Sequence, residues 1–140
     1  MDNCIFCKII NKEIPAEIIY ETEKAIAVLD IHPCARGHTM VLPLTHVETL
    51  VELPDNEIEF VFKAVKKVIE ILQKSFEPEG FTIGINQKEA AGQAIKHLHI
   101  HIIPRWKNDG GGSIHSVVHN PPKESIQEIR NIILNNIKEI

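Results

Sequence analysis

The chain has 140 residues, of which 44% are hydrophobic and 24% charged, and its formal net charge is −4. This length suffices for one core without disulfides, and the composition excludes a disordered chain, a membrane-spanning chain and a strongly basic nucleic-acid-binding surface. We therefore expect a single domain over 1–140, with neither nucleic acid nor a membrane as partner. The N-terminal segment MDNCIFCKII lacks the pattern of a secretory signal, which predicts a cytoplasmic protein.

The first half of the chain predicts one short helix and three strands. A partial apolar stripe indicates a helix over 4–12, and Pro15 ends it. Two β-like runs at 18–21 and 25–30 flank the polar turn TEK, which predicts a hairpin. The segment GHTMVLPLTH supplies a third, mostly apolar strand, and Pro43 marks its end.

The second half predicts two helices and two more strands. From Asp55, an expected N-cap, apolar residues recur at helical spacing through Leu72. The segments GFTIGIN and HLHIHII predict strands, and an amphipathic helix over 122–138 closes the chain, with Pro122 near its start. Because no β-α-β alternation repeats, the predicted fold class is α+β with an antiparallel sheet.

Three histidines, His97, His99 and His101, alternate with aliphatic residues in HLHIHII. Side chains of a strand alternate faces, so the imidazoles should share a solvent-exposed face while the aliphatic side chains enter the core. A half-exposed strand whose polar residues happen to be histidine is one explanation. The others are a Zn²⁺ site with an open position for water, and a nucleophilic imidazole whose neighbours fix its tautomer and donate to a phosphate.

The segment GQAIKHLHIHII resembles the motif His-x-His-x-His, followed by two apolar residues, of the histidine triad (HIT) superfamily of nucleotide hydrolases and transferases. The segments CIFCKIINKEIPAEIIYE, AVLDIHPCARGHTMVLPLTH and INQKEAAGQAIKHLHIHIIPR occur in the order that such proteins show, and the N-terminal Cys-x-x-Cys is similar to a bacterial subset. The resemblance implies an α+β domain with an antiparallel sheet of about five strands and two main helices. It also implies a homodimer that extends the sheet.

The same resemblance implies a hydrolase or transferase that acts at the α-phosphorus of a purine nucleotide, either a dinucleoside polyphosphate or a nucleoside phosphoramidate. His99 would attack to form a nucleotidyl-histidine, which water would then hydrolyse. His97 and His101 would flank the phosphate, with His101 donating to a non-bridging oxygen, and His38 would be the fourth histidine of the site. No metal is needed at the reacting phosphorus.

Substrate-binding residues are implied in the same way. Asp30 would accept the ribose hydroxyls, and Asn86 and Gln93 would contact phosphate. Four apolar residues would sandwich the base, although ordinary core packing explains them at least as well: Ile5, Phe6, Ile9 and Leu29.

Ala94 departs from the family pattern, because many members carry Ser or Thr there, with a hydroxyl that helps the leaving group depart. Weaker activity on phosphoramidates is expected, since an amine leaving group needs a proton more than a polyphosphate does. A non-catalytic nucleotide-binding or interaction module is therefore one alternative. A zinc hydrolase with the triad as ligands is another.

Cys4 and Cys7 have the spacing common in zinc sites, but two thiols supply only half of a tetrahedral shell. A pair of reduced thiols on a short helix is the alternative. By resemblance to the bacterial subset, Cys4, Cys7, His46 and His97 would bind a structural Zn²⁺. A zinc-bound His97 could not be the nucleophile. Cys34 stands alone and is expected to pack as a small apolar residue.

Overall fold

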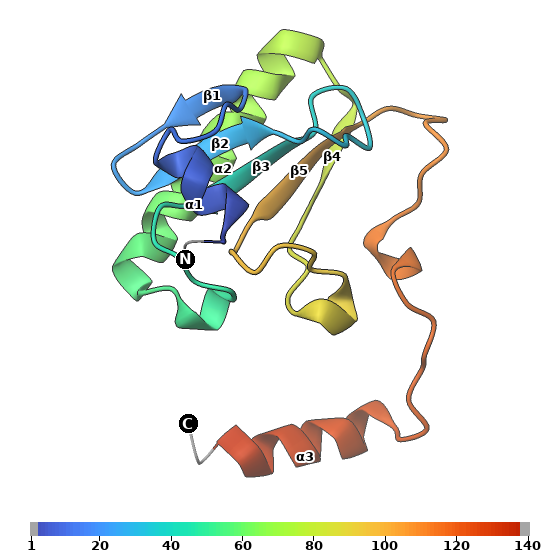
Figure 1. Cartoon of the computed structure of the whole chain (residues 1–140). Coiled ribbons are helices and arrows are strands. Elements are labelled where there is room, and N and C mark those ends of the chain that lie inside the picture. Colours follow the sequence, from blue (N-terminus) through green and yellow to red (C-terminus); the bar gives the residue numbers. More distant parts are fainter. Residues whose placement is uncertain (1–2, 138–140) are drawn as a thin grey trace. The chain divides into compact units, whose positions relative to one another are not determined.

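The computed structural model describes residues 3–137. Its centre is a five-stranded antiparallel sheet in the order β1-β2-β3-β5-β4. Helices α1 (Ile5–Ile10) and α2 (Asp55–Phe76) pack on opposite faces of this sheet (Figure 1). The five strands are β1 (Ile18–Glu21), β2 (Ala25–Leu29), β3 (Thr39–Pro43), β4 (Gly80–Gly84) and β5 (Ile100–Arg105). The predicted α+β class, with about five strands and two main helices, is confirmed.

Two apolar layers cover the sheet. The layer beneath α2 contains the aliphatic residues of HLHIHII, as predicted: Leu98, Ile100 and Ile102 are all buried there. The layer beneath α1 contains Phe6 and Ile9 of the helix, packed on Ile26, Val28, Met40 and Leu42. The prediction that the histidine face is open to solvent is wrong, because α1 covers it and His97 and His99 are buried.

The first predicted hairpin is present, with β1 paired antiparallel to β2. β3 ends at Pro43, as predicted. Helix α2 begins at Asp55, but its N-cap is Pro54 rather than Asp55. Asp55 lies in the first turn, so its carboxylate is still at the positive end of the helix dipole.

The strand predicted for HLHIHII begins only at Ile100. Pairing with β3 stops at Val41↔Ile100, and continuing that register would set Leu98 opposite Pro43. Pro43 has no N–H to donate, and its carbonyl accepts a hydrogen bond from the His97 ring at 2.9 Å. The Leu98 N–H donates instead to the Val47 carbonyl at 2.7 Å. His97 and His99 therefore precede the strand.

Residues 111–137 belong to a second compact unit, which is described by itself. Its helix α3 (Ile126–Ile137) begins later than the predicted 122 because Ser125 and Glu128 form a capping box. The Ser125 hydroxyl accepts the Glu128 N–H at 3.1 Å, and the Glu128 carboxylate accepts the Ser125 N–H at 3.4 Å. Residue 138 of the predicted helix lies outside the described residues.

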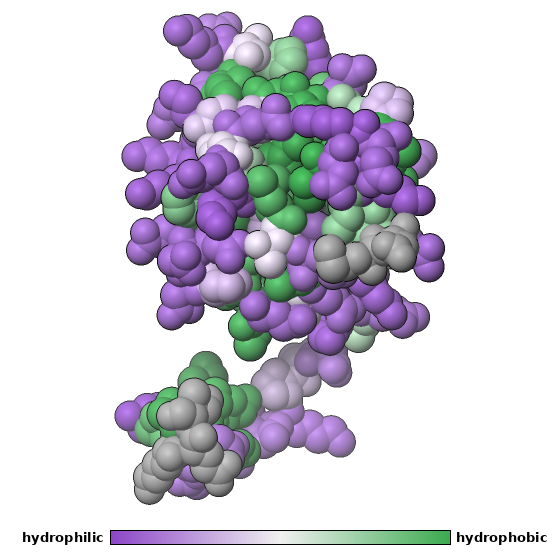
Figure 2. Space-filling view, turned by 60° about the vertical axis from the view of Figure 1, so that its left-hand side comes forward, coloured by the Kyte–Doolittle hydropathy of each residue, from purple (hydrophilic) through white to green (hydrophobic). Residues whose placement is uncertain are grey.

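Apolar side chains of this second unit are exposed, and Figure 2 shows hydrophobic side chains at its surface. Within residues 3–137, no helix is long and apolar enough to cross a bilayer. The single domain over 1–140 stays a prediction.

Candidate active site and metal centre

The residues predicted for catalysis meet on the α1 side of the adjacent strands β2, β3 and β5. Asp30 follows β2, His38 precedes β3, and His99 precedes β5, which contains His101. The ring centroids of His99 and His101 are 5.0 Å apart, and those of His38 and His101 are 5.1 Å apart. These side chains therefore form one cluster.

His99 is held in one tautomer by the main chain. Its Nδ1 lies 2.7 Å from the His97 carbonyl oxygen, and because a carbonyl only accepts, Nδ1 carries the proton. The lone pair of the neutral ring then lies on Nε2. Phe6 packs edge-on against this ring, with centroids 5.1 Å apart. The neutral ring thus presents an oriented lone pair, as a nucleophile requires.

A chain of hydrogen bonds fixes the tautomers of the other two histidines. The Cys34 N–H donates to His38 Nδ1 at 3.0 Å, so the proton of His38 lies on Nε2. His38 Nε2–H donates in turn to His101 Nδ1 at 2.9 Å, with an Asp30 oxygen 3.5 Å from the same Nε2. His101 then carries its proton on Nε2. The ring is a donor without being a cation.

Burial keeps both members of this chain neutral. Burial, followed by the charges of His99 and His38, lowers the pKa of His101 to about 4, and only Asp30 opposes this shift. Burial also lowers the pKa of His38, against the attraction of Asp30. Neutral rings preserve the donor–acceptor order along the chain.

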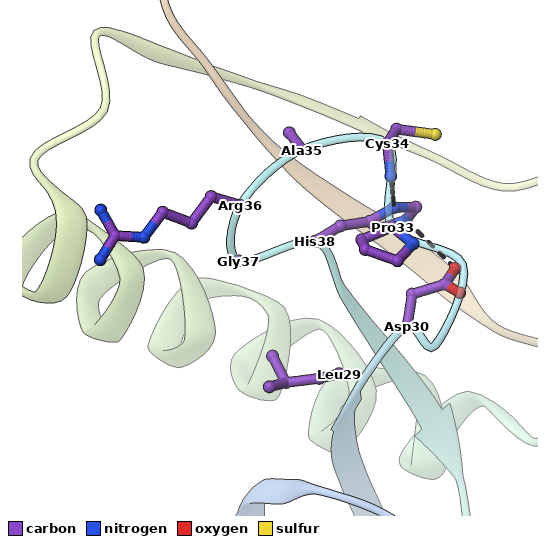
Figure 3. Close-up of a pocket in the computed structure, with 8 residues that line it drawn as sticks. All are labelled: Leu29, Asp30, Pro33, Cys34, Ala35, Arg36, Gly37 and His38. Atoms are coloured by element: carbon purple, nitrogen blue, oxygen red, sulfur yellow. Dashed lines mark hydrogen bonds and ion pairs between the residues drawn. The ribbon is translucent and has the colours of Figure 1, made fainter.

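A pocket of about 400 Å³ opens beside Asp30 and His38. Figure 3 shows the Asp30 carboxylate turned toward the His38 ring, while Arg36 points away toward α2. Cys34 is exposed, so its predicted apolar packing is wrong: the turn uses the Cys34 N–H and leaves its side chain outside. The lining residues are Leu29, Asp30, Pro33, Cys34, Ala35, Arg36, Gly37 and His38.

The four apolar residues predicted to hold the base differ in their surroundings. Leu29 lines the pocket, and Ile5 is 43% exposed. Phe6 and Ile9 are buried in the layer beneath α1. Their contacts with a base stay predictions.

The two polar residues predicted to contact phosphate differ in burial. Asn86 is exposed in the segment after β4. Gln93 is buried, and its amide bonds the main chain: Nε2 donates to the carbonyls of Glu48 and Ile95, and Oε1 accepts the Lys88 N–H. Gln93 thereby ties the loop before the triad to Glu48 in the loop after β3, and its phosphate contact stays a prediction.

The four predicted metal ligands converge between α1 and the sheet. The Sγ atoms of Cys4 and Cys7 lie 3.4 and 3.6 Å from His97 Nδ1. His46 Nδ1 lies 3.3 Å from Cys7 Sγ and 3.2 Å from His97 Nδ1. Ordinary Zn–S and Zn–N bonds in a tetrahedron give about 3.6 Å between S and N and about 3.3 Å between two N atoms. The spacing fits a tetrahedral zinc ion.

One imidazole lone pair faces three other potential ligands in this cluster. His97 Nε2–H donates to the Pro43 carbonyl, so Nδ1 offers a single lone pair, which faces Cys4, Cys7 and His46 together. A carbonyl that orients a ligating imidazole is the usual partner at a metal site. Burial, followed by the neighbouring Cys4, raises the pKa of Cys7 to about 11, so metal binding would release its proton. The donor set fits zinc.

A second group of potential ligands, Asp30, His38 and His101, is better described as the hydrogen-bond chain above. A metal on His38 Nε2 would require the proton on Nδ1, where the Cys34 N–H already donates. The three triad histidines also have separate partners for their Nδ1 atoms, which disfavours a zinc hydrolase with the triad as ligands.

Sequence reasoning missed the groups that orient these rings. The Pro43 and His97 carbonyls and the Cys34 N–H are main-chain atoms, which leave no signal in residue types. A partly buried contact between Thr45 and Glu57 was also missed: the Thr45 hydroxyl donates to the Glu57 carboxylate and anchors the segment of His46 to α2. Helical spacing that sets Glu57 beside buried Val61 was the available signal.

Comparison with known proteins identifies the class. The HIT domain model matches residues 11–108, and the chain belongs to this family. An uncharacterised HIT-like protein of Methanocaldococcus jannaschii is 50% identical over 107 residues, covering 76% of this chain and 82% of that protein. An adenosine 5′-monophosphoramidase of Candida albicans is 36% identical over 107 residues, covering 74% and 70%. The crystal structure of a HIT-family member from Bacillus subtilis matches with TM-score 0.86 and 38% identity, covering 99% and 97%.

Proposed function

We propose that the chain is a nucleotide hydrolase or transferase that cleaves at the α-phosphorus of a purine nucleotide through an intermediate on His99. The observation that carries the proposal is the His99 tautomer, since its Nδ1–H is committed to the His97 carbonyl and its Nε2 lone pair is left for attack. Membership of the HIT family and the similarity to a monophosphoramidase support the hydrolase class. Dinucleoside polyphosphates and nucleoside phosphoramidates are the proposed substrates.

The proposed reaction has two displacements. First, the Nε2 lone pair of His99 forms a bond to phosphorus while the bond to the leaving group breaks. Water then attacks phosphorus, the N–P electron pair returns to Nε2, the nucleoside monophosphate is released, and the proton that the water loses passes to solvent. His101 Nε2–H donates to a non-bridging oxygen in both steps, and His38 holds that proton in place. Asp30 accepts the ribose hydroxyls, and Asn86 and Gln93 border the phosphate. None of these steps needs a metal at phosphorus.

The test is detection of the covalent intermediate. Incubation with diadenosine polyphosphate, a rapid acid-free quench and peptide mass spectrometry should place one nucleotidyl group on His99. His99→Ala should abolish both adduct and turnover, whereas His119→Ala, which changes an exposed histidine of the second unit, should keep both. Polyphosphate should turn over faster than phosphoramidate, because Ala94 offers no hydroxyl to an amine leaving group.

The alternative is a non-catalytic nucleotide-binding or interaction module, and Ala94 is the feature that favours it. Calorimetric titration with a nonhydrolysable nucleotide separates the two functions. Tight binding without adduct or turnover would establish the module and contradict the enzyme.

We further propose that Cys4, Cys7, His46 and His97 hold a structural Zn²⁺. The ion would cross-link the first turn of α1 to the segment before β5 and to the loop after β3. A six-residue helix needs such support because it is too short to be stable alone. Protein purified under reducing conditions without added metal should contain about one zinc per chain. A content near zero would contradict this assignment.

Two remaining expectations are also proposals. We propose a homodimer that extends the sheet, which light scattering coupled to size-exclusion chromatography would test. We propose that the protein acts in the cytoplasm without nucleic acid or membrane partners.

A further inference from the structure

His97 joins the Cys/His cluster to the proposed nucleophile. Its ring Nδ1 faces the two thiols and His46, and its Nε2–H donates to the Pro43 carbonyl. Its own carbonyl accepts the Nδ1–H of His99 at 2.7 Å. The side chain is fully buried, so it has no solvent to move into. The ring that faces the cluster and the carbonyl that orients His99 therefore belong to one immobilised residue.

Helix α1 makes a second connection between the cluster and the nucleophile. Cys4 is its N-cap and accepts the Cys7 N–H, and Phe6 lies between the two cysteines. The Phe6 ring packs edge-on against His99 at 5.1 Å and against His97 at 5.8 Å. Phe6 is 3% exposed. Whatever fixes Cys4 and Cys7 therefore also fixes the wall behind the His99 ring.

The His99 tautomer depends on where the His97 carbonyl lies. A neutral imidazole interconverts between two tautomers, and only the one protonated on Nδ1 leaves Nε2 free for phosphorus. A main-chain acceptor selects this tautomer only while its distance and direction are kept. His97 lies outside β5, so the peptide group that contains its carbonyl is held by the single Leu98 N–H bond to Val47 and by the side-chain contacts of His97, and not by the ladder of that strand.

We propose that the Cys4–Cys7–His46–His97 cluster is a positioning device for the nucleophile: with its metal bound, it sets the tautomer of His99 through the His97 carbonyl and the Phe6 ring. The cluster residues then act on catalysis without touching substrate. The effect on catalysis rests on the proposed function of His99. The effect on the His99 tautomer does not depend on that function.

The direct test is nitrogen NMR of protein labelled with ¹⁵N-histidine, at one fixed pH, in zinc-loaded, chelator-stripped and reloaded samples. The loaded and reloaded samples should show His99 as a single tautomer protonated on Nδ1. The stripped sample should show the averaged signals of two tautomers. In parallel, the rate of adduct formation on His99 should fall about 10- to 100-fold on stripping and recover on reloading, the effect typical of lost support around a site.

If the zinc-free protein unfolds, a variant with weaker zinc binding provides the same test in folded protein. His46→Asn leaves three ligands and weakens zinc binding, so a titration with buffered zinc varies occupancy in one folded sample. The His99 tautomer signal should then follow the measured occupancy. Cys34→Ser is the matched control for loss of a thiol, because Cys34 lies outside the cluster, and it should retain zinc and the single-tautomer signal.

The outcomes distinguish this inference from the proposed function. A folded, zinc-free sample with an unchanged His99 tautomer and adduct rate would overturn the positioning role. A loaded protein that forms no adduct would contradict the proposed function, yet the tautomer measurement would still decide whether the cluster orients His99.

Discussion

At the scale of single residues, one amino-acid type serves three purposes in this site, and the hydrogen-bond partner of each ring decides its purpose. His97 presents Nδ1 because Pro43 takes its Nε2–H, and His99 presents Nε2 because His97 takes its Nδ1–H. His101 becomes a donor because His38 occupies its Nδ1. The triad motif thus places three imidazoles, and their acceptors and donors differentiate them.

The lowered pKa of His101 predicts a pH dependence of stability. In the unfolded chain an imidazole takes up a proton near pH 6.5, whereas folded His101 does so only near 4. Between these values the unfolded state binds more protons, so the free energy of unfolding should fall as pH drops from 6.5 to 4. Replacing His101 should remove a part of that fall on the order of 1–3 kcal/mol.

Urea unfolding of the wild type and of His101→Asn, at pH 4.5 and pH 7 with zinc buffered, measures this difference. The wild type should lose more stability between the two pH values than the variant does. Equal losses would show that His101 does not titrate abnormally in the folded protein.

At the scale of elements, period-two alternation predicted the buried side of the triad segment but not its strand limits. Leu98, Ile100 and Ile102 enter the α2 layer whether or not the backbone is paired, because an extended chain alternates faces in either case. Strand pairing ends at Ile100 because the same register would set Leu98 opposite Pro43, which a reading of one segment at a time does not reveal. The cover provided by α1 was missed for the same reason, since it depends on packing between distant segments.

The turn between β2 and β3 provides an element-scale prediction at Gly37. Gly37 has φ +87°, and a Cβ there would lie 2.9 Å from the Phe76 ring at the end of α2. Arg36 stacks on that ring, with Cζ 4.6 Å from the centroid, so the ring is held between two contacts. Gly37→Ala should lower the free energy of unfolding by about 1–3 kcal/mol through backbone strain and overpacking.

Gly110→Ala is the matched control, because Gly110 has φ +81° and open space where a Cβ would lie. Urea denaturation of both variants separates the cost of backbone strain, which both share, from the cost of the contact with Phe76, which only the Gly37 variant makes. The Gly37 variant should be the less stable of the two, and an equal loss in both would show that Phe76 yields to the new methyl group.

At the scale of the whole molecule, the core, the triad and the candidate metal ligands all belong to one compact unit. Both apolar layers consist of residues before Gly110, and so do the four cluster residues. The family motifs quoted from the sequence lie in the same part of the chain, which explains why the sequence predicted this unit in detail. For α3 the sequence predicted an amphipathic helix but no partner for its apolar side chains, which are exposed in the described structure.

A chain that ends at Gly110 should therefore fold and bind zinc like the full chain. Its hydrophobic stabilisation is contained in the two layers around the sheet, whereas no residue of α3 is buried. An isolated peptide of residues 111–140 should show little helix by circular dichroism, because a twelve-residue helix is marginal in water without tertiary contacts. Zinc content and the urea midpoint of the 1–110 chain are the measurements. A shortened chain that loses zinc or its cooperative transition would show that residues 111–140 stabilise the fold, and a helical peptide would show that α3 is stable alone.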